Sequence, residues 1–523
     1  MEFPRRIVDL HTHLFNARYM PLASVIGDAM NKPDNALANG VAALLEELTG
    51  SSYKDQNRLF ADIHFLSQSA KDEDRIDQIW KITQHELISA SGSMDAVTKG
   101  VNALGALPLS APVFDLLRTN KISAIVQNLS AIDYVAEGFE KEEAPAPVVP
   151  LDLPLDLALN VPQDEIREFG IHLPFSGFLD RSEQAVKKAL RKVIAEMDAD
   201  AWGERENYVE FFFSMLNSEE EMLTKLIDGY GHGLPSIQFV HFMMDMQMAY
   251  LGHKPPRYPF FPEQVEKMEK LQRKHPAQVF GFCAFDPRRE GDWRARAEDA
   301  LARGFIGFKF YPPLGYKPSG DKPAVQAVTN AFFDFCVDRD IPVFTHCTPQ
   351  GFQTRLKEGG NAHPNGWKAV LETPRWSQLR LCLGHAGGAR IENQGVTSPG
   401  WMAASDEEWA SPNNYARIVT ELCTTYPNVY CEVANMSILL SPNSVPSFIS
   451  NLERARSAAT DEGRPFDLMN KLGYGTDWHM PDMVDNTRRY FEVFLSIMNR
   501  SEYLRYIDKF FWQNALSYMK VPE

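Results

Sequence analysis

Seven apolar, β-rich runs follow one another through the second half of the chain, and this rhythm constrains the fold more than any other feature. Their start-to-start spacings lie between 26 and 49 residues, each enough for a strand, a helix and two loops. Most are apolar almost throughout, as expected of parallel strands buried on both faces. The runs are Ser236–Phe242, Val279–Phe285, Phe305–Tyr311, Ile341–Cys347, Leu379–His385, Asn428–Val433 and Leu472–Asp477.

An eighth run, Ile7–His11, stands near the N-terminus. Eight strands that alternate with helical stretches, such as Asp292–Arg303 and Ala324–Asp338, predict an α/β fold of the (β/α)₈ or TIM-barrel type. An open doubly wound sheet would show the same alternation. It would not readily bring the first and last strands together, so the barrel is favoured.

The barrel then consists of residues 1–14 and 236–523, and residues 15–235 form a large, mostly helical insertion after the first strand. An insertion at the carboxyl end of a barrel lies beside the active site, where it serves as a lid or pocket wall. A structural cap or an oligomerisation element accounts for it equally well. Within it, helices are expected at Asn39–Leu48, Arg75–Ala90, Glu183–Asp198 and Ser218–Ile227. Glu140–Pro162 would be an extended connector or loop. Ile122–Asn128 resembles a strand but is counted with the insertion, because the seven later runs complete the barrel.

Composition excludes several classes of protein. The net charge of −16 argues against nucleic acid or an anionic membrane as a partner, although a pocket can still bind an anionic small molecule. No apolar run approaches the roughly 20 residues of a membrane-spanning helix, and the N-terminus lacks a signal-peptide pattern. The six cysteines form no Cys-x-x-Cys pair, which favours reduced, buried thiols and a cytoplasmic protein. Homo-oligomerisation stays open.

Histidines and an aspartate stand at the ends of four predicted strands. The first strand ends in His11-Thr12-His13, and residues two apart in a strand face the same side. The fifth ends in His346, the sixth in His385 and the eighth in Asp477. The carboxyl ends of barrel strands meet at one face, and imidazole with carboxylate is a ligand set of divalent transition metals. The sequence therefore predicts a metal site there.

These motifs resemble those of the amidohydrolase superfamily, specifically its amidohydrolase 2 (amidohydrolase-related) branch of metal-dependent TIM-barrel hydrolases. The order and the strand positions agree along residues 1–14 and about 236–523, and the helix near Phe511–Ala515 is similar to the family's terminal helix. The insertion matches nothing that we can name. The matching motifs are Asp9–His13, Gly307–Pro313, Thr345-His346, Gly384–Gly387 and Gly475–Asp477.

The resemblance implies roles for individual residues. His11, His13 and Asp477 would bind the metal, with His346 as a further ligand. Asp477 would also be the catalytic base toward water. His385 would be a second catalytic group that polarises the substrate and moves a proton, or a ligand of a second metal.

Lys309 decides between one metal and two. In binuclear members of the superfamily a lysine on the fourth strand is carboxylated and bridges two ions, whereas in this branch a lysine commonly accompanies one. We favour an unmodified Lys309 that pairs with an aspartate or a substrate carboxylate. We therefore expect one divalent ion rather than two, most readily Zn²⁺ with Mn²⁺ as the alternative.

The function expected from this resemblance is metal-dependent hydrolysis of an amide, ester, lactone or related bond in a small molecule. The first alternative is a metal-dependent decarboxylase or hydratase, a lyase, acting on a small unsaturated or aromatic acid. The second alternative is a barrel that binds metal or ligand without turnover, which the complete ligand set argues against. The sequence does not separate the first two.

Four other residues have a functional and a structural interpretation. Asp245 orients substrate or caps the next helix, His479 points into the pocket or supports it, and Arg390 binds an acidic group or lies on the surface. Cys347 is a thiolate or a small packing residue, with packing favoured. Histidines without a strand-end context are left out of the site: His64, His85, His172, His232, His241, His253, His275 and His363.

Overall fold

The computed structural model describes residues 1–29, 214–250, 255–352, 357–393 and 396–522, with a few single positions between 42 and 212. The chain forms two compact units, one of residues 1–15 and 219–523 and the other of residues 16–218. The second unit contributes α1, Leu22–Ala29. The segments predicted at Asn39–Leu48, Arg75–Ala90, Ile122–Asn128, Glu140–Pro162 and Glu183–Asp198 lie outside the described residues, apart from single positions.

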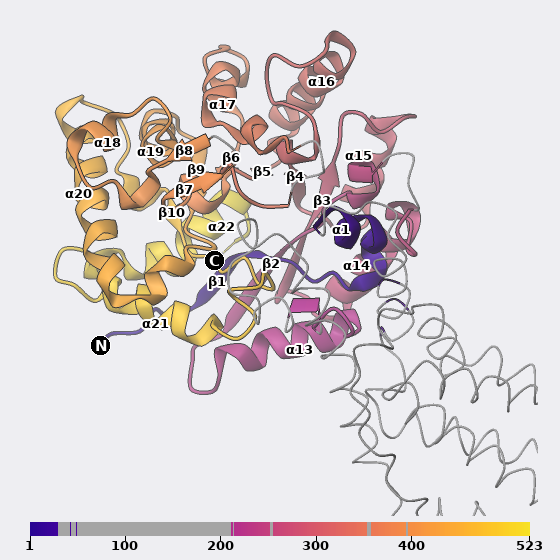
Figure 1. The fold of residues 1–523 in the computed structure, drawn as a ribbon, viewed down its shortest axis with the longest axis horizontal. Helices are drawn as coiled ribbons and strands as arrows, with labels where there is room; N and C mark the ends of the chain where they lie inside the picture. The colour runs from indigo at the N-terminus through magenta and orange to yellow at the C-terminus, as the bar shows by residue number, and fades with distance from the viewer. Residues whose placement is uncertain are drawn as a thin grey trace, which may run out of the picture. The chain divides into compact units, whose positions relative to one another are not determined.

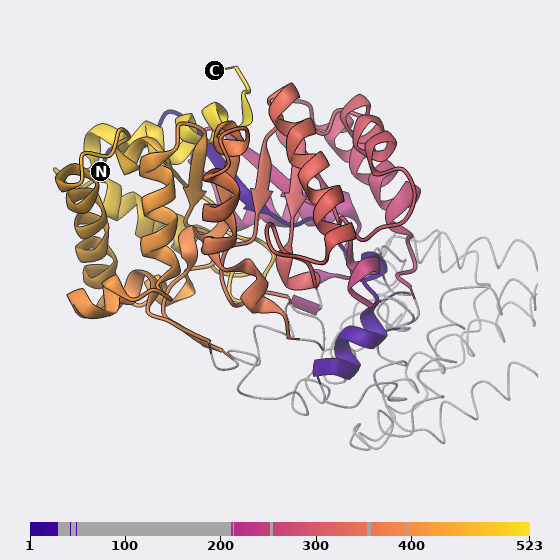
Figure 2. The same ribbon diagram turned by 90° about the horizontal axis from the view of Figure 1, so that it is seen from above.

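The first unit is built on eight parallel strands in the order β1-β2-β3-β4-β5-β6-β9-β10. Helices surround the strands (Figures 1 and 2). This confirms the (β/α)₈ barrel and the position of every predicted strand. The strands are β1 Ile7–Thr12, β2 Ile237–Phe242, β3 Val279–Phe285, β4 Gly307–Phe310, β5 Val343–Thr345, β6 Leu381–Leu383, β9 Val429–Glu432 and β10 Leu472–Gly473.

The first and last strands meet, which an open doubly wound sheet would not do. The backbone N–H of Leu10 donates to the carbonyl of Tyr474 at 3.0 Å, and that of Asp477 donates to the carbonyl of His11 at 2.7 Å. A parallel bridge between Thr12 and Trp478 continues the pairing beyond β10. The closure therefore brings the metal-ligand candidates of the first and eighth strands side by side.

Helices of the first unit follow the predicted alternation. Asp292 caps α15 by accepting from the backbone N–H groups of Arg294 and Ala295, and Pro323 begins α16, where its missing N–H costs nothing. The helix predicted at Ser218–Ile227 is α13. The α-helices are α13 Glu219–Tyr230, α14 Val265–Lys274, α15 Trp293–Ala302, α16 Pro323–Arg339, α17 Pro364–Leu371, α18 Asp406–Ala410, α19 Tyr415–Thr425, α20 Val445–Asp461, α21 Thr487–Met498 and α22 Asn514–Met519.

Aromatic rings fill the barrel beneath its carboxyl end. Phe242 of β2 and Phe344 of β5 lie with ring centroids 3.9 Å apart, and Phe242 also packs edge-on against Phe282 of β3. The same two rings contact the imidazole of His11 at centroid distances of 5.1 and 4.8 Å. The site thus lies above an aromatic floor, a buried layer that includes the rings of Phe242 and Phe344.

One feature of the fold was not predicted. The strands β7, Ile391–Asn393, and β8, Val396–Ser398, form a separate antiparallel pair after β6.

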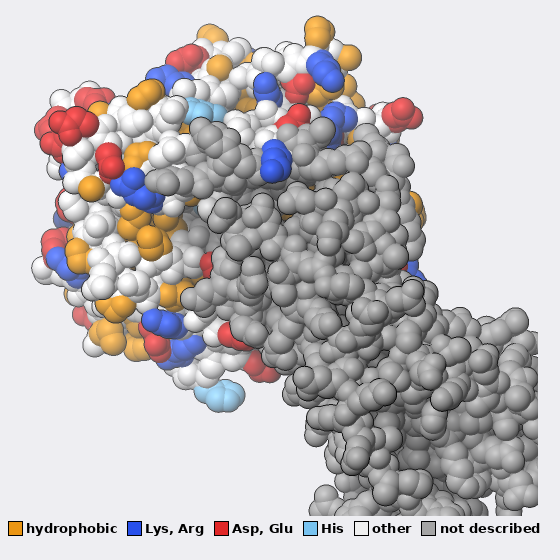
Figure 3. All heavy atoms as spheres, viewed as in Figure 1, with side chains coloured by type: hydrophobic (Ala, Val, Ile, Leu, Met, Phe, Trp, Pro, Cys, Tyr) orange, Lys and Arg blue, Asp and Glu red, His pale blue; other side chains and the backbone are white. Residues whose placement is uncertain are grey.

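All six cysteines are buried and none forms a disulfide, as expected of packing thiols. No helix among the described residues is both long and apolar enough to cross a bilayer. Acidic and basic side chains are interspersed over the described surface that faces the viewer in Figure 3.

Candidate metal centre

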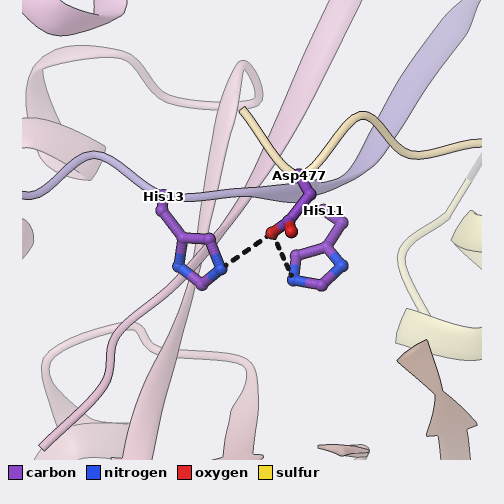
Figure 4. Close-up of side chains that lie close together, drawn as sticks. All are labelled: His11, His13 and Asp477. Carbon is purple, nitrogen blue, oxygen red and sulfur yellow. Dashed lines mark ion pairs between the residues drawn. The ribbon is translucent and has the colours of Figure 1, made fainter. Parts of the chain in front are cut away.

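Three predicted ligands converge at the closure of the barrel. His11 and His13 stand two apart at the end of β1, so both imidazoles project from the same side of the strand. The Nε2 atom of each ring lies 3.2 Å from Oδ1 of Asp477, which follows β10 (Figure 4). All three residues are buried, with at most 5% of their surface exposed. Their donor atoms are near enough to share one ion.

The second nitrogen of each ring fixes which nitrogen is available. His13 Nδ1 donates to the carbonyl oxygen of Phe242 at 2.9 Å, and His11 Nδ1 donates to Oε1 of Glu432 at 2.9 Å. With the proton on Nδ1, the lone pair of each Nε2 faces Asp477. Metal-binding histidines are usually held in this way, through a carbonyl or carboxylate on the other nitrogen. The donor set therefore fits a divalent ion.

Asp477 is held in a backbone conformation that few non-glycine residues adopt, with φ of 64°. Its neighbour Thr476 donates to Asp9 through both its hydroxyl, at 2.6 Å, and its backbone N–H, at 2.9 Å. Burial raises the pKa of Asp477 to about 6, and electrostatic interactions with His385 and Lys309 oppose that rise. The strained turn places a poorly solvated carboxylate against two imidazoles.

His346 and His385 form a second pair beside the first. His385 Nδ1 donates to the carbonyl of Ala434 at 3.1 Å, and His346 Nε2 donates to the carbonyl of Gln350 at 2.5 Å. Their remaining nitrogens, His385 Nε2 and His346 Nδ1, then face each other at 3.0 Å. Two lone pairs at this distance need a cation or one shared proton between them. The structure thus pairs His346 with His385, and its role as a ligand with His11 stays a prediction.

The imidazoles of the site are neutral at pH 7. Burial lowers the pKa of His13 to about 3 and that of His385 to about 4. Burial also lowers the pKa values of His11 and His346 well below the usual range. Neutral imidazole is the form that binds a metal ion, so burial prepares the site for one.

Lys309 of β4 reaches the same cluster. Its Nζ lies 3.3 Å from His11 Nε2 and 4.2 Å from the centroid of the Phe344 ring. Burial lowers the pKa of Lys309 to about 7, against the attraction of Asp477 and Glu432. The amine is therefore poised between its charged and neutral forms. Lys309 thus lies beside the predicted metal ligands, where the sequence predicted it. Whether it is carboxylated stays a prediction.

Glu432, at the end of β9, is a site residue that sequence reasoning missed. It is fully buried, and Oε1 accepts from both His11 Nδ1 and the backbone N–H of His385, at 2.9 and 2.7 Å. Burial raises the pKa of Glu432, and the backbone N–H groups of His385 and Ala434, which favour the ionised carboxylate, oppose that rise. The available signal was a single acidic residue inside the apolar run Asn428–Val433, because such a residue is rarely buried without a partner.

Asp245 and Arg390 have structural partners. Arg289 donates two hydrogen bonds to the Asp245 carboxylate, at 2.5 and 2.7 Å, and Asp245 precedes a short helical turn, Met246–Tyr250. Arg390 pairs with Glu408 at 2.5 Å. Both side chains are engaged within the fold, which agrees with the structural interpretation of each.

Cys347, His479 and His241 are buried around the site. Burial raises the pKa of the Cys347 thiol, which keeps it protonated and favours the packing interpretation. His479 Nδ1 donates to the carbonyl of His13 at 2.9 Å and so supports the ligand strand. His241 of β2, which the sequence left without a role, accepts from the backbone N–H of Leu14 at 2.8 Å.

Residues 266–491 match the family model described as Amidohydrolase, Amidohydro_2. This match confirms the resemblance drawn from the strand-end motifs. No curated protein matches the chain. The matched range contains His346, His385, Glu432 and Asp477, whereas β1 with His11 and His13 lies outside it.

Three solved structures that match part of this chain are as follows. A probable 2-pyrone-4,6-dicarboxylic acid hydrolase from Acinetobacter baumannii is 12% identical over 58% of this chain and 88% of its own, with a TM-score of 0.34. A 5-carboxyvanillate decarboxylase from Novosphingobium aromaticivorans, complexed with manganese, is 14% identical over 61% and 85%, with a TM-score of 0.37. An amidohydrolase 2 from Bifidobacterium longum subsp. infantis is 11% identical over 58% and 87%, with a TM-score of 0.30.

Proposed function

We propose that this chain, whose residues 266–491 match the Amidohydrolase family model, is a metal-dependent hydrolase that cleaves an amide, ester, lactone or related bond of a small molecule. One observation carries the proposal. Nε2 of His11 and Nε2 of His13 both lie 3.2 Å from one carboxylate oxygen of Asp477, inside a buried cluster. A divalent ion bound between these three groups would account for two imidazole nitrogens that converge on one buried carboxylate oxygen.

His11, His13 and Asp477 would hold one divalent ion, with His346 as a further ligand. A bound Zn²⁺ or Mn²⁺ would polarise a substrate oxygen and lower the pKa of a coordinated water. The aromatic floor formed by Phe242 and Phe344 would keep bulk water away from these donors.

Asp477 would act as the base. With a pKa of about 6, its carboxylate is ionised at neutral pH and accepts a proton from the attacking water. His385, whose Nε2 faces the cluster, would polarise the substrate carbonyl and pass the proton to the leaving group. Lys309 would bind an acidic substrate group in its charged form. If it is carboxylated instead, it would bridge two ions with His385 as a second-site ligand.

The purified protein, loaded separately with Zn²⁺ and Mn²⁺, should be mixed with panels of esters, lactones, amides and aromatic acids. Release of acid from an ester, lactone or amide, absent in Asp477→Asn, is the expected result. Release of CO₂ from an aromatic acid without hydrolysis would assign the lyase alternative. Full metal loading without turnover of any panel would contradict the proposal and favour the non-catalytic barrel.

A further inference from the structure

Glu432 accepts three N–H groups from three different parts of the site. Oε1 receives His11 Nδ1 at 2.9 Å and the backbone N–H of His385 at 2.7 Å. Oε2 receives the backbone N–H of Ala434 at 2.5 Å. Glu432 is fully buried at the end of β9, so no water replaces these bonds. A carboxyl group is the side chain that can accept on both oxygens at once.

The hydrogen bond from His11 to Glu432 determines which nitrogen of this predicted metal ligand carries the proton. Because Nδ1–H of His11 donates a hydrogen bond to Glu432 Oε1, the lone pair of His11 lies on Nε2, which faces Asp477 at 3.2 Å. The opposite tautomer would aim an N–H at the ion. Without Glu432, His11 would exchange between the two tautomers and rotate more freely.

The bond to His385 holds a turn that the chain would otherwise avoid. His385 and Ala386 have φ of 60° and 45°, values that are unfavourable for residues with a Cβ. The hydrogen bond from the His385 backbone to Glu432 offsets part of that cost. Space for the carboxylate is also built in, since a Cβ at Gly475 would lie 2.8 Å from Glu432 Oε2.

We propose that Glu432 is a positioning residue that orients His11 for metal binding and holds the His385 turn, so that one carboxyl group couples both halves of the site. This inference rests on the proposed function, in which His11 binds the ion. Glu432, His11 and His385 also lie close enough together to hold an ion themselves. Both oxygens of Glu432 already accept N–H groups, which favours positioning over ligation.

The test compares Glu432→Leu, Glu432→Gln and the control Tyr490→Phe. Leu is similar in size but offers no acceptor, while Gln can keep its amide oxygen toward His11 and His385. The Tyr490 hydroxyl accepts from the backbone N–H of Met436 at 3.1 Å and donates to the carbonyl of Val433. Its removal therefore disturbs the same strand end without touching either histidine.

Zn²⁺ affinity and the absorption spectrum of the Co²⁺-loaded protein are the readouts. Glu432→Leu should bind Zn²⁺ about 10–100-fold more weakly, the usual effect of losing a group that orients a ligand, and should shift the Co²⁺ bands. Glu432→Gln should recover most of the affinity, and Tyr490→Phe should match the wild type. The number of ions per chain should be unchanged.

Wild-type affinity and spectrum in Glu432→Leu would overturn the inference and leave the proposed function standing. So would a Gln variant as impaired as Leu, or a fall from two ions to one, which would make Glu432 a ligand. If the wild-type protein binds no ion, the proposed function would be contradicted as well.

If Glu432→Leu does not fold, ¹⁵N NMR of histidine-labelled, metal-free wild-type protein decides, with the His11 signal assigned by His11→Gln. The inference expects His11 protonated on Nδ1. Protonation on Nε2 would overturn it.

Discussion

Asp9 is not a predicted metal ligand, but its hydrogen bonds hold the segment that carries Asp477. Its carboxylate accepts from the hydroxyl of Tyr230 at 2.7 Å and from Thr476 twice, at 2.6 and 2.9 Å. These bonds join β1 to the turn that carries Asp477. The turn in which Asp477 has its positive φ is therefore held by hydrogen bonds to Asp9.

Asp9→Asn should lower the free energy of unfolding by about 1–3 kcal/mol. Its amide NH₂ would replace a carboxylate oxygen that now accepts a hydrogen bond, so that two donors would face each other. Urea unfolding would measure this. Tyr230→Phe removes one of the four groups that donate to Asp9, the fourth being the backbone N–H of His11 at 3.3 Å, and should cost less. Equal stability of wild type and Asp9→Asn would show that this network does not support the closure.

Asp477→Asn separates metal binding from chemistry. Asn keeps one oxygen as a ligand but cannot accept a proton from water. We expect it to retain a substantial part of the metal and to lose roughly 10²–10⁴-fold in turnover, toward the larger end of that range. Metal analysis and steady-state kinetics are the measurements, with the exposed Asp485→Asn as a charge-matched control. Near-wild-type turnover would remove the catalytic role of the last strand.

At the scale of elements, the apolar runs predicted each barrel strand but not its length. The run Leu472–Asp477 forms only two residues of β10, since the chain leaves regular pairing before the positive φ of Asp477. The hairpin of β7 and β8 was missed because its strands have three residues each and polar positions, so no apolar run marks them.

The candidate site was predictable where residues stand at strand ends. His11, His13 and Asp477 come together because parallel strands deliver their carboxyl ends to one face. Glu432 was not found, since a single acidic residue within an apolar run gives no spacing pattern. The pairing of His346 with His385 depends on ring orientation and on carbonyl partners such as Gln350. Strand position does not determine either.

The end of β1 should be essential for metal binding but not for folding. His11→Ala and His13→Ala should each lose most of the bound metal while the far-UV circular dichroism stays unchanged, because the barrel core does not depend on the ion. His232→Ala, at an exposed loop position, is the matched control. Full metal occupancy in both site variants would contradict the assignment of β1.

At the scale of the whole molecule, the metal and the fold are expected to be linked only loosely. The barrel closes through backbone bonds between β1 and the segment after β10, and its interior is packed with aromatic and aliphatic side chains. The ion would therefore add stability to a structure that already exists. This differs from small metal domains, which unfold without their ion.

Removal and return of the metal test this expectation. As-purified protein should carry about one equivalent of Zn²⁺ or Mn²⁺, set by availability among ions that suit an imidazole–carboxylate site. Dialysis against a chelator should abolish turnover but leave the far-UV spectrum intact. Adding Zn²⁺ at 100 times its Kd should then raise the free energy of unfolding by about 2.7 kcal/mol, since the ion binds only the folded state. Two equivalents, with carboxylated Lys309 in the density of a crystal, would replace the one-metal centre by a bridged pair. Collapse of the spectrum on chelation would instead make the ion part of the fold, because a barrel held by its core alone would keep its helices and strands.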